Sequence, residues 1–128
     1  MYAMVRRYRM ATGSMDDLMH KVDTQFADRL QEQLGILHYQ AIDTGDGTIM
    51  TVTVFEDEDQ CRRSETAAAG VREGLAEFLV EEIHALTGEV MVSRASEKVL
   101  DPVHHQAATS TRYFTVGETS TLLAEEQQ

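Results

Sequence analysis

Residues 36–57, ILHYQAIDTGDGTIMTVTVFED, decide the fold because they read as two β-strands joined by a tight turn. The turn chemistry is concentrated in DTGDGT, where Gly45 and Gly47 accept positive φ angles and two aspartates can cap the turn through their side chains. The flanking strands are rich in β-branched and aromatic residues. This stretch therefore predicts a β-hairpin in the middle of the domain.

A strand and a helix are predicted before the hairpin. Residues 2–10 alternate loosely between two faces, as a strand does. Ser14 is suited to be the N-cap of the following helix, and Gly35 is suited to its C-cap. Between these caps, apolar residues recur at helical spacing, namely Met15, Leu18, Met19, Val22, Phe26, Leu30 and Leu34.

A second helix and a last strand are predicted after the hairpin. Asp57 and Gln60 resemble a capping box. An apolar face then runs to residue 83 and comprises Cys61, Ala68, Val71, Leu75, Phe78, Leu79 and Ile83. Residues 89–94, EVMVSR, are predicted to be the final strand. The element order is β-α-β-β-α-β, which indicates an α+β domain with a four-stranded antiparallel sheet.

The pairing register of the hairpin decides which side chains share a face. If Ile42 pairs with Ile49, polar and apolar residues separate, whereas a shift of one residue mixes them. The preferred register gives a polar face with His38, Gln40, Thr51 and Thr53, and an apolar face with Leu37, Tyr39, Ala41, Met50, Val52 and Val54. Helices can cover only one face, and an apolar sheet face needs cover too. A second copy of the chain is the expected cover, so we predict a homodimer.

Composition limits the function classes. The 128 residues suit one domain, which we assign to residues 1–95, followed by a C-terminal extension at 96–128. In that extension, residues 112–116 form a β-prone island that could add an edge strand. The net charge of −11 disfavours nucleic-acid binding, which requires a basic surface.

The expected location is the cytoplasm. Cys61 is the only cysteine, residues 1–10 lack the apolar core of a signal peptide, and no apolar run approaches the length of a membrane span. We therefore expect no membrane association.

Three segments carry a resemblance to a known family. They are residues 2–8, residues 45–57 with their closing VFED, and residues 88–94 with GEVMV. Together with the Ser-capped helix they resemble the dimeric α/β-barrel superfamily, and within it the small antibiotic-biosynthesis-monooxygenase-type (ABM) domains. The resemblance implies a ferredoxin-like subunit, a dimer in which two sheets meet face to face, and a ligand cavity between each sheet and its own helices.

The resemblance also implies a choice of activities. Members of this family oxidise polyketide quinone precursors without metal or flavin, or degrade haem, and both groups rely on an Asn and a Trp in the cavity. This chain contains neither residue. Where similar sequences carry a Trp on the second helix, the chain offers Gly70, which would widen the cavity. We expect no cofactor, and the residues leave open whether the chain is an enzyme.

Candidate site residues follow from the predicted faces. His38 could act as a general base toward a phenol or enol, or could be a polar strand residue bonded to Thr53. Tyr8 could hold a substrate oxygen, or could simply pack. Further ligand-binding candidates are Tyr39, Gln40, Thr51, Thr53, Gly70 and Gly74. No metal site is predicted, because adjacent His104 and His105 rarely chelate one ion and no acidic or cysteine spacing supports them.

Three functions remain open on the sequence. The first is a homodimeric ABM-like domain that binds a small organic molecule, with cofactor-independent oxygenation of a phenolic or polyketide-type substrate as its potential chemistry. The second is a non-catalytic ligand-binding or accessory dimerisation module. The third is a purely structural dimer whose tail recruits a partner.

Overall fold

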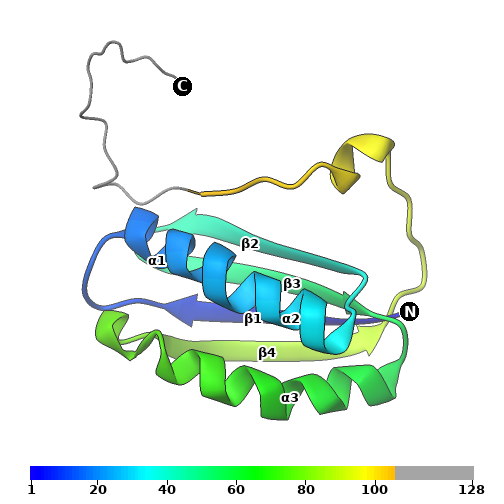
Figure 1. Ribbon diagram of the computed structural model, residues 1–128, viewed down its shortest axis with the longest axis horizontal. Helices are drawn as coiled ribbons and strands as arrows, with labels where there is room; N and C mark the ends of the chain where they lie inside the picture. The colour runs from blue at the N-terminus through cyan, green and yellow to red at the C-terminus, as the bar shows by residue number, and fades with distance from the viewer. Residues whose placement is uncertain (106–128) are drawn as a thin grey trace.

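The computed structural model describes residues 1–105, apart from the side chains of 67–69, 71 and 72. The sheet has the strand order β2-β3-β1-β4 with antiparallel pairing throughout. The helices lie over one face of the sheet (Figure 1). The elements are β1 (Tyr2–Arg9), α1 (Met15–Lys21), η1 (Val22–Ala27), α2 (Asp28–Leu34), β2 (His38–Gly45), β3 (Thr48–Phe55), α3 (Glu58–Glu73), η2 (Ala76–Phe78), β4 (Glu81–Glu89) and η3 (Glu97–Leu100). The predicted βαββαβ order and the α+β, ferredoxin-like fold class are confirmed.

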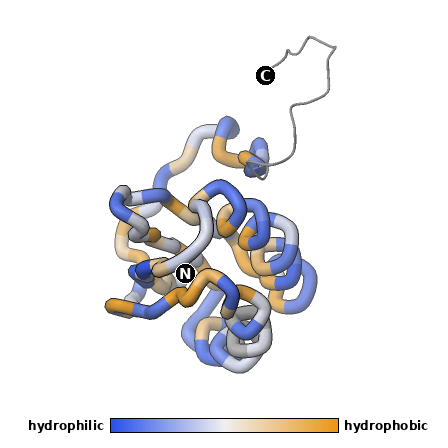
Figure 2. The backbone as a smooth tube through the Cα atoms, turned by 90° about the vertical axis from the view of Figure 1, so that its left-hand side faces the viewer, coloured by the Kyte–Doolittle hydropathy of each residue, from blue (hydrophilic) through white to orange (hydrophobic). Residues whose placement is uncertain are grey.

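The first helical stretch begins and ends at the predicted caps. The backbone N–H of Asp17 donates to Ser14 Oγ at 3.1 Å, which satisfies one of the free donors of the first turn. Gly35 ends the stretch in the left-handed conformation with φ 64°. Between the caps, the helix widens into a π-helical segment, η1, that the apolar spacing did not predict. In the end-on view, hydrophobic residues of the helices face the strands and hydrophilic ones face outward (Figure 2).

The second helix begins as predicted and ends early. The N–H of Gln60 donates to Asp57 Oδ1 at 2.8 Å, and Gln60 Oε1 accepts from the N–H of Glu56 at 2.7 Å. The helix ends at Glu73, and Leu79, with a φ of 49°, ends the short 3₁₀ turn that follows. The prediction that it continues to residue 83 is wrong.

The last strand is β4, and its predicted position at 89–94 is also wrong. β4 pairs with β1 along Glu81–Glu89, immediately after the early end of the helix. It is an edge strand and every residue in it is exposed, so it lacks the in–out alternation by which strands are recognised. Ile83 and Leu86 are three residues apart, which is also the spacing of apolar residues on one face of a helix.

The hairpin pairs one residue out of the predicted register. The turn is centred on Asp46 and Gly47, both with positive φ, and a bulge at Thr44 precedes it. As a result, Ile42 pairs with Met50 instead of Ile49. Tyr39, Ala41, Thr51 and Thr53 therefore face the helices, while His38, Gln40, Ile42, Met50, Val52 and Val54 lie on the open face.

The open face of the sheet combines apolar side chains with polar ones, and it carries no helix among the described residues. The polar ones are Arg7, Arg9, His38, Gln40 and His84. Val5 of β1 lies between Val52 and Leu86 in the pairing across the sheet. The side chains are incompletely covered, with Leu86 58% and Ile42 39% exposed. An apolar surface of this kind is the feature from which the sequence predicted a second subunit.

Two apolar clusters form the core between the sheet and the helices. One cluster comprises Met4, Leu30, Ile36, Phe55 and Cys61, and the other Leu18, Met19, Ile49, Leu75 and Phe78. Tyr39 packs at the edge of the first cluster, and Tyr8 at the edge of the second. None of the helices in the described part of the chain has the length and apolarity of a membrane span.

The segment after β4 returns to the first helix. His104 Nδ1 lies 3.0 Å from Asp23 Oδ2, and His105 Nε2 lies 2.8 Å from Asp16 Oδ1. These contacts fasten the segment to α1 and η1 as far as residue 105. The predicted strand at 112–116 lies outside the described residues.

Candidate functional site

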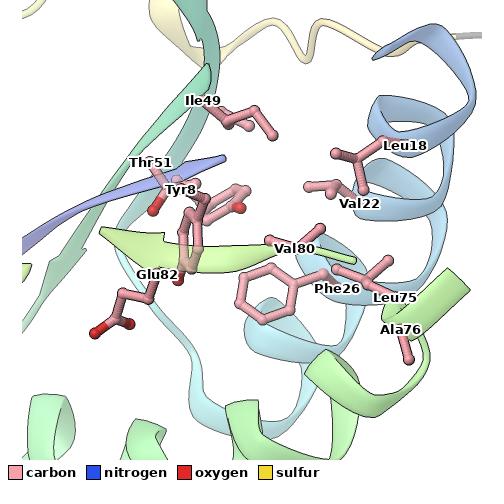
Figure 3. A pocket seen from close by; sticks show the side chains of 12 residues that line it. Tyr8, Leu18, Val22, Phe26, Ile49, Thr51, Leu75, Ala76, Val80 and Glu82 are labelled. Carbon is pink, nitrogen blue, oxygen red and sulfur yellow. The ribbon is translucent and has the colours of Figure 1, made fainter. Parts of the chain in front are cut away.

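A cavity of about 100 Å³ lies between the sheet and the helices. Most of its lining residues belong to the second core cluster or pack against it, and two, Phe26 and Tyr39, pack against the first. Figure 3 shows the lining side chains of the strands on one side of this space and those of the helices on the other, with the Glu82 carboxyl group pointing away from it. They are Tyr8, Leu18, Val22, Phe26, Tyr39, Ala41, Ile49, Thr51, Leu75, Ala76, Val80 and Glu82.

The helical wall of the cavity depends on the π-helical segment. Val22 and Phe26 both belong to η1 and both line the cavity. π-Helical turns are rare and occur frequently at functional sites. The Phe26 ring also contacts the Tyr39 ring across the space between helix and sheet, with ring centroids 5.5 Å apart.

The sheet wall supplies hydroxyl groups. Tyr8, Tyr39 and Thr51 lie on β1, β2 and β3, with their side chains toward the helices. Burial, and secondarily the proximity of Tyr8, raises the pKa of Tyr39 well above its ordinary value. Tyr39 therefore remains a neutral hydrogen-bonding phenol at physiological pH.

Glu82 lies at the edge of the cavity because of an irregularity in β4. Arg7 pairs with His84 and Tyr8 pairs with Glu82, so Ile83 is bulged out of the ladder. The bulge places Glu82 on the helix side beside Tyr8, where it lines the cavity. Its side chain is 39% exposed, which puts it at the solvent edge.

A buried arginine lies next to this edge. Arg6 is only 7% exposed, and its Nη2 lies 2.5 Å from a Glu65 carboxylate oxygen on α3. Its Nη1 lies 3.4 Å from Glu82 Oε1. Burial opposes the charge, but hydrogen bonding to Glu65 and Tyr8 outweighs it and raises the pKa of Arg6.

The Arg6 side chain also holds an unsatisfied donor. Its Nε is buried without a hydrogen-bond partner among the described residues. Buried polar groups without a hydrogen-bond partner are uncommon in folded proteins.

The turn between α3 and β4 closes one end of the cavity through Leu75, Ala76 and Val80. Backbone contacts hold this turn in place, since the N–H groups of residues 11 and 12 donate to the carbonyl oxygen of Phe78 at 3.1 and 3.3 Å. An ion pair between Lys21 and Glu77 adds a second attachment. The cavity therefore has a fixed wall at this end.

The structure brings together some of the predicted site residues and separates others. Tyr8, Tyr39 and Thr51 line the cavity, and Thr53 is buried on the same face outside it. The prediction that His38 and Gln40 lie in the cavity is wrong. The observed pairing register places both on the open face.

Neither predicted glycine widens the cavity. Gly70 and Gly74 are exposed and do not line it, and a β-carbon at Gly70 would meet no described atom within 4 Å.

Cys61 is a structural residue, and the described residues hold no metal cluster. Cys61 is buried in the first core cluster, and burial raises the pKa of its thiol, which disfavours the reactive thiolate. Within residues 1–105, no group of three or more His, Cys, Asp or Glu side chains is arranged to hold a metal ion.

Of the lining residues, only Tyr8, Tyr39 and Thr51 were predicted as site residues, and those missed include Glu82 and the π-helical pair, Val22 and Phe26. Val22 and Phe26 had been recognised only as members of an apolar helical stripe. No sequence pattern predicts the bulge at Ile83. This bulge is what places Glu82 on the helix side of the sheet.

Solved structures with this fold include several ABM-type proteins. A variant of SnoaB, a cofactor-independent oxygenase from Streptomyces nogalater, superposes with a TM-score of 0.58 at 14% identity, covering 72% of this chain and 94% of that one. A protein from Deinococcus radiodurans, provisionally named an antibiotic biosynthesis monooxygenase, gives 0.57 at 9% identity and covers 73% and 97%.

A dimeric ferredoxin-like protein from an uncultured marine organism gives a TM-score of 0.58 at 10% identity and covers 75% of this chain and 100% of that one. No protein-family model and no curated protein sequence matches the chain. Identities this low establish the architecture only. The chain has the ABM-like, ferredoxin-type fold of these structures.

Proposed function

We propose that the chain binds a small, largely apolar organic molecule in the cavity between its sheet and helices. The observation that carries the proposal is the cavity itself, which is walled by aliphatic and aromatic side chains and bordered by a few polar groups on one side. Ligand sites have this composition.

The cavity size indicates the size of the ligand. Its volume of about 100 Å³ is smaller than the roughly 150 Å³ of an apolar cavity that binds benzene. Nothing larger than a single ring therefore fits without displacement of the walls. A monocyclic phenolic ligand suits the cavity better than a fused polyketide ring system.

Toluene is a suitable first probe because it is one apolar ring. We expect saturable methyl chemical-shift changes in NMR titrations, concentrated at Leu18, Val22 and Ile49. Ala41→Leu should abolish binding by filling the cavity, whereas Ala85→Leu on the exposed edge strand should leave binding intact. The absence of saturable shifts in the wild type, or equal binding by Ala41→Leu, would contradict the proposal.

Oxygenation of a monocyclic quinol is the second candidate, and the fold shared with a cofactor-independent oxygenase favours it. In such a reaction, one atom of dioxygen enters the ring and the other leaves as water, with the quinol supplying the electrons. Tyr8 is the proposed residue to hold the substrate oxygen.

Oxygen uptake with hydroquinone tests this activity directly. We expect uptake above the autoxidation rate, reduced at least tenfold by Tyr8→Phe and preserved in Tyr2→Phe, whose ring packs against the core and does not line the cavity. Uptake at the autoxidation rate in the wild type would leave the chain as a non-catalytic binding module.

We further propose that the binding unit is a homodimer in which the open sheet faces pack together. Val5, Met50, Val52 and Val54 form a continuous apolar strip on that face, and Leu86 extends it toward the edge. A second copy would remove this strip from water.

A further inference from the structure

Two hydroxyl groups that line the cavity have no hydrogen-bond partner among the described residues. They belong to Tyr39 on β2 and Thr51 on β3. Neither oxygen is sealed by packing, whereas Arg6 Nε, which also lacks a partner, is sealed. Hydroxyl groups inside a protein usually have a partner, so two accessible ones without a partner in the same cavity are a feature that a ligand would explain.

The pairing of the strands places Thr51 between two tyrosines. Ala41 of β2 pairs with Thr51, and Tyr39 lies two residues before Ala41. On the other side, Arg6 of β1 pairs with Thr51, and Tyr8 lies two residues after Arg6. Thr51 is therefore a diagonal neighbour of both tyrosines. Burial is the main cause of the raised pKa of Tyr39, and the proximity of Tyr8 is the second, so the two phenols extend toward the same space.

Ala41 keeps the space beside Thr51 open. Its methyl group is the smallest of the strand side chains that line the cavity. The opposite, helical wall consists of apolar side chains (Figure 3), namely those of Leu18, Val22 and Phe26. The cavity therefore has an apolar side for a ring and a side with free hydroxyl groups for an oxygen atom on that ring.

The lining also restricts the charge of this oxygen. The phenol of Tyr39 stays neutral and has a proton to donate, and Thr51 Oγ1 has lone pairs that can accept. None of the lining residues in the described part of the chain carries a positive charge. An anion would lose its hydration here without gaining a counterion, which is costly. A neutral hydroxyl group, which accepts one hydrogen bond and donates another, matches the two protein groups.

We propose that Tyr39 and Thr51 are the specificity-determining residues for an uncharged monocyclic phenol. Tyr39 donates a hydrogen bond to the phenol oxygen, and Thr51 Oγ1 accepts one from the phenol proton. This inference rests on the proposed binding function and states how the site recognises its ligand. A ring without a hydroxyl group would leave both protein groups unpaired, so the pair favours phenol.

Phenol and toluene form a matched pair of probes, because they differ only in hydroxyl against methyl. Their dissociation constants are measured by NMR titration at neutral pH for the wild type, Tyr39→Phe and Thr51→Val. Each substitution removes one hydroxyl group and keeps a side chain of similar shape. Tyr2→Phe and Thr87→Val are the matched controls, because they remove the same groups from residues that do not line the cavity.

The ratio of the two dissociation constants is the readout, because a general distortion of the cavity weakens both probes. We expect each variant to weaken phenol binding about fivefold while toluene binding changes less than about twofold. The controls should keep the wild-type ratio.

An unchanged ratio in either variant, or a wild type that binds toluene and not phenol, would overturn the roles of Tyr39 and Thr51 and leave the binding function standing. Failure of both probes to bind the wild type would overturn the binding function as well.

Discussion

Tyr39 both lines the cavity and contributes to the stability of the folded protein. Its phenol is inserted between sheet and helix against Phe26, and burial keeps its pKa above the ordinary value of 10.0. In the folded protein the ring remains neutral at pH values where the unfolded chain ionises. Its contribution to stability is therefore complete below pH 10 and is lost as the pH rises above that value.

Alkaline unfolding measures this contribution. Between about pH 10 and 11 the free energy of unfolding should fall by up to about 1.4 kcal/mol per pH unit because of Tyr39. Urea titrations of Tyr39→Phe should show a smaller loss over the same range. An identical pH dependence in the wild type and the variant would show that Tyr39 ionises freely in the folded state.

The candidate site was predictable where residue type alone decides. Tyr8, Tyr39 and Thr51 were proposed as site residues and they line the cavity, although the predicted register had put Tyr39 on the opposite face. His38 was expected there for its chemistry, but a strand residue reaches a cavity only if the register directs it inward. Glu82 could not be predicted, because its direction depends on a bulge opposite another strand.

The elements differed in how clearly the sequence marks them. The first helical stretch was predicted end to end because Ser14 and Gly35 carry strong local capping signals. The π-helical segment inside it has no such signal, since a widened turn preserves the apolar face. Residues 76–83, which form η2 and the start of β4, were wrongly predicted as helix. Their apolar residues stand at helical spacing, and the exposed strand β4 lacks the alternation of buried and exposed residues that marks a strand.

The hairpin was correctly located and incorrectly paired. The sequence DTGDGT offers several two-residue turns, and separation of polar from apolar faces favoured the wrong one. Asp46 takes a φ of 55°, a conformation that aspartate accepts more readily than most residues, and the bulge at Thr44 completes the shift. The geometry of the turn therefore determined the pairing register, and the separation of polar from apolar faces did not.

At the scale of the molecule, the two faces of the sheet carry different features. One face carries the helices, the core and the cavity, and the other presents the apolar strip around Val52. The observed register places His38 and Gln40 on this face, where the prediction had Tyr39 and Ala41, and adds Ile42 opposite Met50. The apolar residues of β3 stay on this face, so the proposal of a homodimer rests on them.

A charge in the middle of the open face should prevent self-association. We expect the wild type to show twice the chain mass by light scattering at micromolar concentration. Val52→Lys should show the mass of one chain, because a buried unpaired ammonium at an interface is costly. Leu79→Lys, at an exposed apolar residue in the turn before β4, should remain dimeric. A monomeric wild type would refute the homodimer.

The position of a bound ring tests the central claim most directly. Intermolecular NOEs between toluene and protein methyl groups report which side chains surround it. The cavity predicts NOEs to Leu18, Val22, Ile49 and Leu75, from both helical and strand walls. NOEs confined to Val52 and Leu86 on the open face, or none at all, would contradict a ligand site between the sheet and the helices.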